Sequence, residues 1–161
     1  MDKRIEFQRL TTVALADIME LMNHPLVRRQ MPLLQGYFGE AEAKAFVAAK
    51  EALWAEHGYG PWAFVAEGQF AGWGGVQPEG PEVDLALVLH PDYWGMGKAL
   101  YQEIIRRAFG EMGHTSVTVL FPPSRTRIQG LLRLGFQEDA VHQIDQQQFI
   151  RYRLVKQEGE T

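Results

Sequence analysis

Residues 94–100, Trp-Gly-Met-Gly-Lys-Ala-Leu, join two glycines to the start of a helical pattern. The apolar run before them stops at His90-Pro91, and the apolar residues after them recur at helical spacing as far as Met112. A strand that leads through a glycine turn into a helix directs backbone N–H groups and the positive end of the helix dipole at one point. Glycine also lets an anion approach the backbone and permits positive φ. The segment therefore predicts a binding site for a phosphate or pyrophosphate group.

Two common phosphate-binding motifs do not fit this loop. A Walker loop needs a glycine five residues before Gly97 and Ser or Thr after Lys98, but Asp92 and Ala99 occupy these positions. A dinucleotide-binding fingerprint needs glycine or alanine where Leu100 stands, and an acidic residue about 20 residues further on, which the sequence lacks there. A helix-initiating turn without any ligand is the plain alternative.

A second pattern follows at residues 115–121, which are rich in β-branched side chains, as a buried strand should be. Pro122-Pro123 ends this strand, and Ser124 is a suitable N-cap for a short helix. Gly135 then stands at the expected C′ position, followed by Phe136. The apolar face of that helix would comprise Ile128, Leu131 and Leu132.

These two patterns, in this order and at this separation, resemble the GNAT N-acetyltransferases. Residues 94–99 are similar to the family's pyrophosphate loop, Gln/Arg-x-x-Gly-x-Gly/Ala. Trp94 replaces the Gln or Arg, which resembles the branch that contains the ribosomal-protein N-terminal acetyltransferases. The strand, loop and short helix ending at Gly135-Phe136 resemble the second half of the GNAT core. The resemblance is firm over residues 60–137 and holds in outline elsewhere.

The resemblance implies an α+β fold whose central sheet is mixed and mostly antiparallel. Helices would flank both faces of this sheet, which would splay in the middle to hold acyl-CoA. It also implies a CoA-dependent N-acetyltransferase with acetyl-CoA as co-substrate. We expect one domain over residues 1–161, with a frayed tail from 156. The residues expected to bind acetyl-CoA are Leu87, Val88, Leu89, Trp94, Gly95, Met96, Gly97, Lys98, Ala99, Leu100, Ser124, Arg125 and Arg127.

Two carboxylates lie on the strand that leads to the loop. Side chains alternate along residues 82–89, so Glu82 and Asp84 share one face. Acetylation of an amine needs the ammonium to lose a proton, and a carboxylate with a raised pKa can take it directly or through water. Asp84 is the better candidate because it lies deeper in the strand. Solvated or salt-bridged carboxylates are the alternative for each residue.

The leaving thiolate also needs a proton, which many GNAT enzymes supply from a tyrosine on the last core helix. Leu131 stands at that position, so the usual acid is absent. Ser124 is a further catalytic candidate, because its hydroxyl could bind the pantetheine or the leaving sulfur, although a pure N-cap role is equally compatible. Without a side-chain acid, solvent can protonate the thiolate, since thiols have a pKa of about 8.5.

Aromatic residues bracket the side where the amine would enter, and Tyr37, Phe38, Trp62 and Trp73 are candidates for binding it. Core packing is the alternative role for most of them. The acceptor would be a small-molecule or peptide amine, such as a protein N-terminus. A catalytically silent acyl-CoA-binding module is the rival interpretation, because the acid is absent and two candidates for the base stay open.

Composition agrees with one globular domain. The 161 residues are 46% hydrophobic and 22% charged, and the net charge of −4 argues against a nucleic-acid partner. No apolar run is long enough to span a membrane, no hydrophobic signal core begins the chain, and we expect a cytoplasmic protein that could form a homodimer. The chain has no cysteine, and its five histidines lack metal-ligand spacing, so we expect no metal.

The sequence predicts both strands and helices along the chain. Residues 5–10 should form a first strand, and Thr12 should cap a helix that ends at Asn23-His24-Pro25. An aromatic loop leads to a helix over 40–57, and residues 61–66 and 70–76 should pair as a hairpin around Glu67-Gly68. Segments 140–144 and 147–155 should form a closing hairpin.

Overall fold

A computed structural model describes residues 4–125 and 128–157, and the chain divides into two compact units. Unit 1 comprises Met1–Gln77 and Ala86–Gly97, and unit 2 comprises Pro78–Leu85 and Lys98–Thr161. Strand β4 (Glu82–Leu89) therefore gives its first half to unit 2 and its second half to unit 1.

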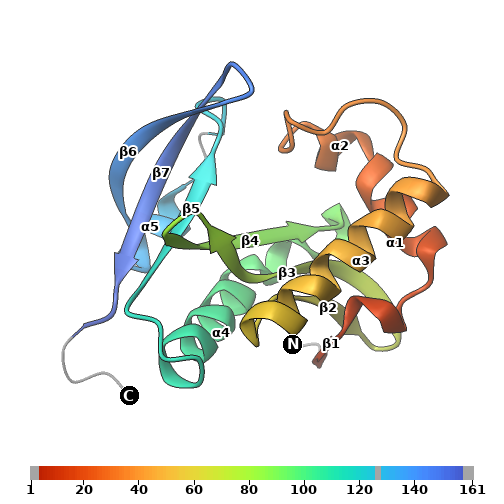
Figure 1. The fold of residues 1–161 in the computed structure, drawn as a ribbon, viewed down its shortest axis with the longest axis horizontal. Coiled ribbons are helices and arrows are strands. Elements are labelled where there is room, and N and C mark those ends of the chain that lie inside the picture. Colours follow the sequence, from red (N-terminus) through yellow and green to blue (C-terminus); the bar gives the residue numbers. More distant parts are fainter. Residues whose placement is uncertain (1–3, 126–127, 158–161) are drawn as a thin grey trace. The chain divides into compact units, whose positions relative to one another are not determined.

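Unit 1 holds the N-terminal strand and helices, a hairpin, and the second half of β4 (Figure 1). A short 3-10 helix, Leu10–Thr12, follows the first strand. Another, η2 (Pro91–Met96), follows β4. The remaining elements are β1 (Ile5–Gln8), α1 (Leu15–Asn23), α2 (Pro25–Arg28), α3 (Glu40–His57), β2 (Pro61–Ala66) and β3 (Gln69–Glu79), whose last two residues belong to unit 2.

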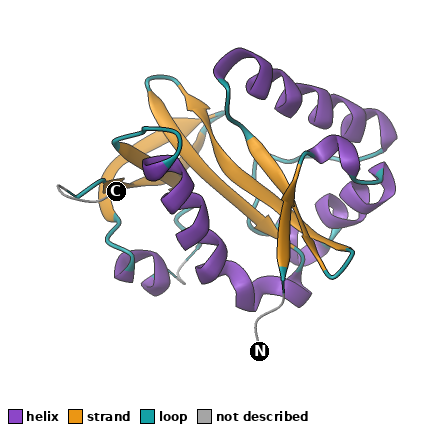
Figure 2. Ribbon diagram, turned by 90° about the horizontal axis from the view of Figure 1, so that it is seen from below, coloured by secondary structure: helices purple, strands orange, loops and turns teal. Residues whose placement is uncertain are grey.

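Unit 2 combines three further strands with two helices, and Figure 2 shows the strands in orange and the helices in purple. Helix α4 starts directly at the end of η2. Strand β7 pairs with β5 on one side and with β6 on the other, so the closing hairpin expected from the sequence is confirmed. The elements are α4 (Gly97–Gly110), β5 (Ser116–Phe121), α5 (Gln129–Arg133), β6 (Gln137–Ile144) and β7 (Gln147–Val155).

The seven strands follow the order β1-β2-β3-β4-β5-β7-β6. Strands β4 and β5 run parallel with Asp84 opposite Thr118, whereas β1/β2, β2/β3, β5/β7 and β6/β7 pair antiparallel. The expected mixed, mostly antiparallel sheet with helices is therefore confirmed. This pairing places Thr118 of a central strand beside one of the two candidate bases.

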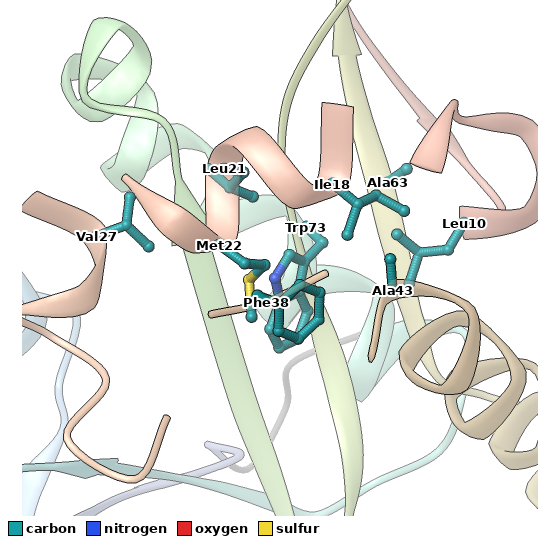
Figure 3. Close-up of a cluster of buried hydrophobic side chains, with 9 residues drawn as sticks. All are labelled: Leu10, Ile18, Leu21, Met22, Val27, Phe38, Ala43, Ala63 and Trp73. Carbon is teal, nitrogen blue, oxygen red and sulfur yellow. The ribbon is translucent and has the colours of Figure 1, made fainter. Parts of the chain in front are cut away.

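The core of unit 1 anchors the second half of β4. Figure 3 shows nine buried side chains that form this core. Ala86 and Val88 of β4 are partly buried and pack against it. Burying one large apolar side chain contributes about 1.5–3 kcal/mol, so this packing fixes the strand that leads into the glycine loop. The nine residues are Leu10, Ile18, Leu21, Met22, Val27, Phe38, Ala43, Ala63 and Trp73.

Two glycines of β3 allow an unusually close approach to β4. A Cβ at Gly72 would lie 2.1 Å from the Val88 carbonyl oxygen, and one at Gly74 would lie 2.6 Å from the Ala86 carbonyl oxygen. Any larger residue would force the strands apart, so glycine is required at both positions.

Several local expectations are wrong. Thr12 does not cap a helix: it lies in the 3-10 helix, where its hydroxyl bonds to Arg9 O and Gln8 Oε1, and Ala14 precedes α1 without a side-chain cap. Ser124 does not cap one either, because α5 begins only after Ile128. The first strand ends at Gln8 rather than 10.

The two C-terminal expectations had different outcomes. The helix stop at Gly135 is confirmed by its φ of 107°. The tail expected to fray from 156 begins in an ordered contact, because the backbone N–H of Lys156 donates to Thr115 O at 2.8 Å.

Candidate active site

The glycine loop is a continuous helical segment. The expected turn takes the form of η2, whose cap is His90: Nδ1 of His90 accepts the backbone N–H of Asp92 at 3.2 Å. Trp94 donates its indole N–H to Leu89 O at 2.8 Å, which ties the loop back to the end of β4. The expected helix starts at Gly97, and the first turn of α4 contains no acidic residue. The positive end of the helix dipole is therefore not offset by a carboxylate on the first turn.

Neither loop glycine is required by the backbone or by packing. Gly97 has φ −56° and ψ −45°, which any residue adopts, and Gly95 is not among the glycines with positive φ. A Cβ added at either glycine would meet nothing within 4 Å. The loop therefore does not use the positive φ that glycine permits, and the open space beside both glycines is available to a bound group.

The other residues expected to bind acetyl-CoA differ in exposure. Lys98 and Ala99 are exposed, Met96 is half-buried, and Leu100 is buried. On β4, Leu87 and Val88 are half-buried and Leu89 is buried. The backbone N–H and C=O groups of these residues, rather than their mostly apolar side chains, are suited to polar contacts with a coenzyme.

After β5, Ser124 lies in a turn in which the Arg125 N–H donates to Pro122 O at 2.9 Å. The Arg125 guanidinium stacks 4.0 Å from the centroid of the Phe121 ring. Arg127 lies outside the described residues. Of the two arginines expected to bind acetyl-CoA after β5, Arg125 therefore has a described position and Arg127 does not.

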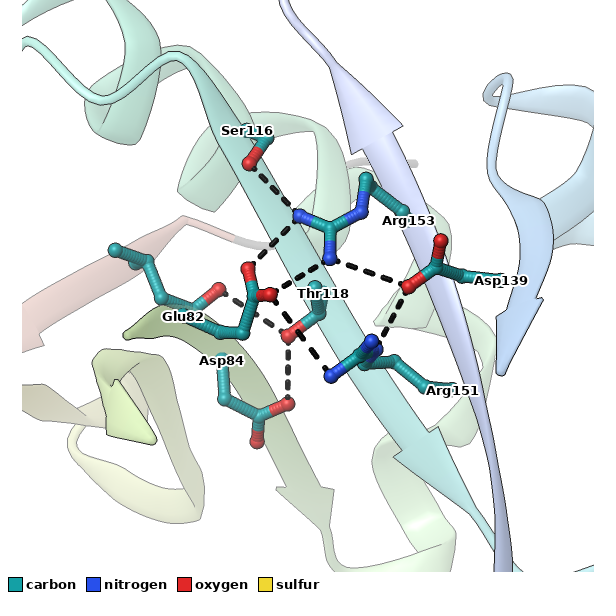
Figure 4. Close-up of polar contacts among 8 residues, drawn as sticks. Glu82, Asp84, Ser116, Thr118, Asp139, Arg151 and Arg153 are labelled. Carbon is teal, nitrogen blue, oxygen red and sulfur yellow. Dashed lines mark hydrogen bonds and ion pairs between the residues drawn. The ribbon is translucent and has the colours of Figure 1, made fainter. Parts of the chain in front are cut away.

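The Glu82 carboxylate is held by arginines. Arg153 donates to both of its oxygens at 2.8 Å, and Nη1 of Arg151 lies 3.8 Å from Oε2 (Figure 4). The hydrogen bonds from Arg153 keep the pKa of Glu82 below its ordinary value, although partial burial opposes the effect. Asp139 of β6 accepts from Arg151 and Arg153 and completes a network of two acids and two bases. A carboxylate held in this way is a poor proton acceptor.

Asp84 has a different setting. It is half-buried, and its Oδ1 accepts the Thr118 hydroxyl at 3.2 Å (Figure 4). Thr118 is buried and lies opposite Asp84 in the parallel ladder, so the pairing of β4 with β5 creates this contact. Asp84 thus lies beside the arginine network and is tied to strand β5 through Thr118.

Tyr101, on the second turn of α4, is a further polar group of unit 2 that the sequence did not single out. Burial raises the pKa of its hydroxyl, Arg125 opposes this rise, and the Asp84 charge adds to it. Tyr101 is therefore protonated at neutral pH.

The four aromatic candidates for acceptor binding have different surroundings. Tyr37 is 73% exposed, whereas Phe38 and Trp73 belong to the core of unit 1. Trp62 is buried, with its ring 5.4 Å from that of Trp54. The indole N–H of Trp73 is buried and finds no hydrogen-bond partner among the described residues. Packing accounts for three of these rings and leaves Tyr37 available to a ligand.

The loop that carries Tyr37 is fixed from within. The Asn23 side-chain amide accepts the backbone N–H of Phe38 at 2.9 Å and donates to its carbonyl at 2.8 Å. Arg28 donates to Gly36 O, at 2.6 Å. These bonds pin the loop on both sides of Tyr37.

Leu131, at the position of the usual tyrosine acid, is buried in α5 and offers no proton. Within residues 4–125 and 128–157, no group of three or more His, Asp or Glu side chains could hold a metal ion. No helix in the described part of the chain is long and apolar enough to cross a membrane.

The mixed seven-stranded sheet, the glycine loop after a central strand and the carboxylates on that strand agree with the fold that the sequence resemblance implies. The family model "Acetyltransferase (GNAT) domain" matches residues 4–137, and the chain belongs to this family. The resemblance seen in the sequence is confirmed. The chain is therefore a CoA-dependent N-acetyltransferase, whose family takes the acetyl group from acetyl-CoA.

Solved structures show the same fold. An acetyltransferase of the GNAT family from Bacillus anthracis superposes with a TM-score of 0.73 at 15% identity, covering 96% of both chains. An acetyltransferase from Agrobacterium tumefaciens gives 0.75 at 17% identity, covering 97% of this chain and 94% of the other. A protein described as a ribosomal-protein-serine acetyltransferase from Vibrio cholerae gives 0.72 at 15% identity, with 97% and 96% covered.

Proposed function

We propose that this enzyme moves the acetyl group of acetyl-CoA directly to a primary amine, with Asp84 as the general base. The amine nitrogen attacks the thioester carbonyl, the C–N bond forms and the C–S bond breaks. The proton lost from the ammonium goes to the Asp84 carboxylate, directly or through one water molecule. Binding both substrates in one orientation supplies much of the remaining rate enhancement.

The observation that carries this assignment is the arginine contact of Glu82, the other carboxylate on this face of β4. Glu82 accepts two short hydrogen bonds from Arg153, which stabilise its charged form. Asp84 lies deeper in β4, and its Oδ1 accepts the hydroxyl of Thr118 on the neighbouring strand. Because the arginine holds Glu82 in its charged form, Asp84 is the carboxylate of β4 that we propose as the base.

The leaving thiolate would take its proton from solvent. Leu131 occupies the position of the family's usual acid, and its side chain cannot donate. With a pKa of about 8.5, a thiol is a good enough leaving group for this route. Ser124 is proposed to hydrogen-bond the pantetheine or the sulfur rather than to transfer the proton.

Acetyl-CoA is proposed to bind along the end of β4 and at the start of α4. The backbone of Leu87–Leu89 would pair with the pantetheine amides, and residues 94–100 would surround the pyrophosphate. The open space beside Gly95 and Gly97 supports this assignment. Lys98, Arg125 and Arg127 would balance the phosphate charges.

The acceptor is proposed to be a peptide N-terminus or a small-molecule amine, with Tyr37 in contact with it. The exposure of Tyr37, on a loop that Asn23 and Arg28 hold in place, supports this role. The fold likeness to the Vibrio cholerae protein makes peptides that begin with serine one acceptor to test.

Acetyl-CoA turnover with a panel of amines tests the proposal. The panel combines free amino acids, amino-acid amides, polyamines and short peptides, with the released thiol as readout. We expect turnover that depends on both substrates and yields the acetylated amine by mass spectrometry. Binding of acetyl-CoA without acetylation of any amine would contradict the proposal.

A further inference from the structure

A pocket of about 180 Å³ lies in unit 2 next to the proposed base. Its walls come from the β3–β4 turn and from strands β4, β5, β6 and β7. Thr118 lines the pocket and also donates its hydroxyl to Asp84. Thr118 is therefore in contact with both the pocket and the proposed base. The polar lining residues are Glu79, Glu82, Thr118, His142 and Arg151.

Arg151 is the lining residue with unused hydrogen-bonding capacity. Its guanidinium carries five N–H groups, and among the described residues only Nε makes a hydrogen bond, to Asp139 at 2.8 Å. Its Nη1 lies 3.8 Å from Glu82 Oε2, which is too far for a hydrogen bond. The side chain is only 18% exposed, so the donors that remain lie in a sheltered position at the pocket.

Two acidic residues of this region, Glu82 and Asp139, are balanced by arginines. Glu82 and Asp139 carry two negative charges, and Arg151 and Arg153 carry two positive charges within the same network. Both carboxylate oxygens of Glu82 accept hydrogen bonds from Arg153, whereas Glu79 is exposed at the turn. The lining therefore offers donors to a ligand more than it offers acceptors.

We propose that this pocket binds a carboxylate of the acceptor through Arg151, with Thr118 and His142 beside it, so that the enzyme acetylates an amine that carries a carboxylate. This inference rests on the proposed function and names the acceptor class. The ammonium of such a molecule meets Asp84, and its carboxylate meets Arg151, so each charge of the zwitterion finds its opposite.

Size and charge favour a carboxylate over other anions. A pocket of about 180 Å³ is below the roughly 300–1,000 Å³ of a whole small-molecule site, and so fits one functional group. The planar fork of arginine matches the two oxygens of a carboxylate. The single negative charge of a carboxylate also matches the single positive charge of Arg151, whereas a phosphate carries up to two negative charges.

Matched acceptors test the pocket. Turnover is measured with amino acids, with their primary amides and with the corresponding decarboxylated amines. For the best acceptor we expect kcat/KM of the acid to exceed that of the amide by about 10–100-fold, the effect of one buried charged hydrogen-bond pair. In Arg151→Gln the ratio should fall to about 1, whereas the acetyl-CoA affinity should not change.

Arg153→Gln is the matched control, because it removes the same charge from the same network without lining the pocket. The control should lose stability but keep the preference for acids. Arg151→Lys, which keeps the charge and loses the fork, should retain part of the preference and covers the case in which Arg151→Gln does not fold.

A binding experiment separates this inference from the proposed function. Saturation-transfer NMR compares N-acetyl amino acids with N-acetyl amino-acid amides and needs no turnover. We expect at least one acid to bind the wild type more tightly than its amide, and Arg151→Gln to remove the difference. The inference would be overturned if neither experiment showed a preference for acids. It would also be overturned if folded Arg151→Gln kept the preference of the wild type. Absence of turnover alone would count only against the proposed function.

Discussion

Arg153 binds the Glu82 carboxylate through two hydrogen bonds of 2.8 Å, and this contact joins residues 71 positions apart in the chain. It links the first residue of β4 to β7 across β5, which lies between them in the sheet. The contact uses Glu82 to join strands of the sheet, and Asp84, on the same face of β4, is the carboxylate that we propose as the base.

Stability at low pH measures this contact. The folded pKa of Glu82 lies below its ordinary value of 4.5, so its ion pair stabilises the protein fully above about pH 4.5 and is lost as pH falls through the folded pKa. The free energy of unfolding in urea should therefore fall more steeply from pH 5 to pH 2 in the wild type than in Glu82→Gln. Carboxylates outside this network, such as Glu103 with a pKa of about 2, contribute equally to both proteins and cancel in the difference. Parallel pH curves for the two proteins would contradict the assignment.

The two carboxylates also show where sequence reasoning ends. Alternation along residues 82–89 correctly predicts a strand, but it gives Glu82 and Asp84 the same face and the same chemistry. The difference between them comes from Arg153 and Thr118, whose positions depend on strand register. Arg151 and Arg153 share a face of β7 by their two-residue spacing, but no local signal tells which acid they meet.

Local signals succeeded where short-range interactions decide the structure. The helix over 40–57 and the hairpin around Glu67-Gly68 are confirmed, and α4 starts at Gly97 as expected. Individual helix caps were less predictable. Ser124 lies in a turn before α5, and the Thr12 hydroxyl bonds to Arg9 O instead of capping a helix. Aromatic composition did not separate Tyr37, which is exposed, from Phe38 beside it in the core.

Gly97→Glu should abolish acetyl-CoA binding without unfolding the protein. The backbone at Gly97 is helical, and a side chain there meets no protein atom within 4 Å, so the fold tolerates the change. The added carboxylate would stand where the pyrophosphate is proposed to bind. Calorimetry should show no binding at concentrations that saturate the wild type, and the melting temperature should change little.

Gly97→Ala is the control for this substitution, because it adds a Cβ without charge. It should stabilise the helix by up to about 1 kcal/mol and weaken acetyl-CoA binding less than Gly97→Glu does. An unchanged affinity for acetyl-CoA in folded Gly97→Glu would contradict the assignment of the pyrophosphate site to this loop.

Asn23→Ala should weaken the binding of the acceptor amine and leave the binding of acetyl-CoA unchanged. Asn23 makes two hydrogen bonds with the backbone of Phe38 and one with Met19 O, and their loss frees the loop that carries Tyr37. We expect the KM for the amine to rise, with a stability cost of about 1–3 kcal/mol, while the acetyl-CoA Kd is unchanged. Tyr37→Phe provides the comparison that keeps the loop conformation. Equal KM values in Asn23→Ala and the wild type would show that this loop does not contact the acceptor.

The turnover of Asp84→Asn, measured with saturating substrates across pH 6 to 9, tests the proposed base most directly. The substitution keeps the size of the side chain and its contact with Thr118 but removes the proton acceptor. We expect kcat at neutral pH to fall by about 10²–10⁴-fold with an unchanged acetyl-CoA Kd, and Glu82→Gln to keep kcat within about tenfold of the wild type. Wild-type kcat in folded Asp84→Asn, or the large loss in Glu82→Gln instead, would contradict the assignment of Asp84 as the base.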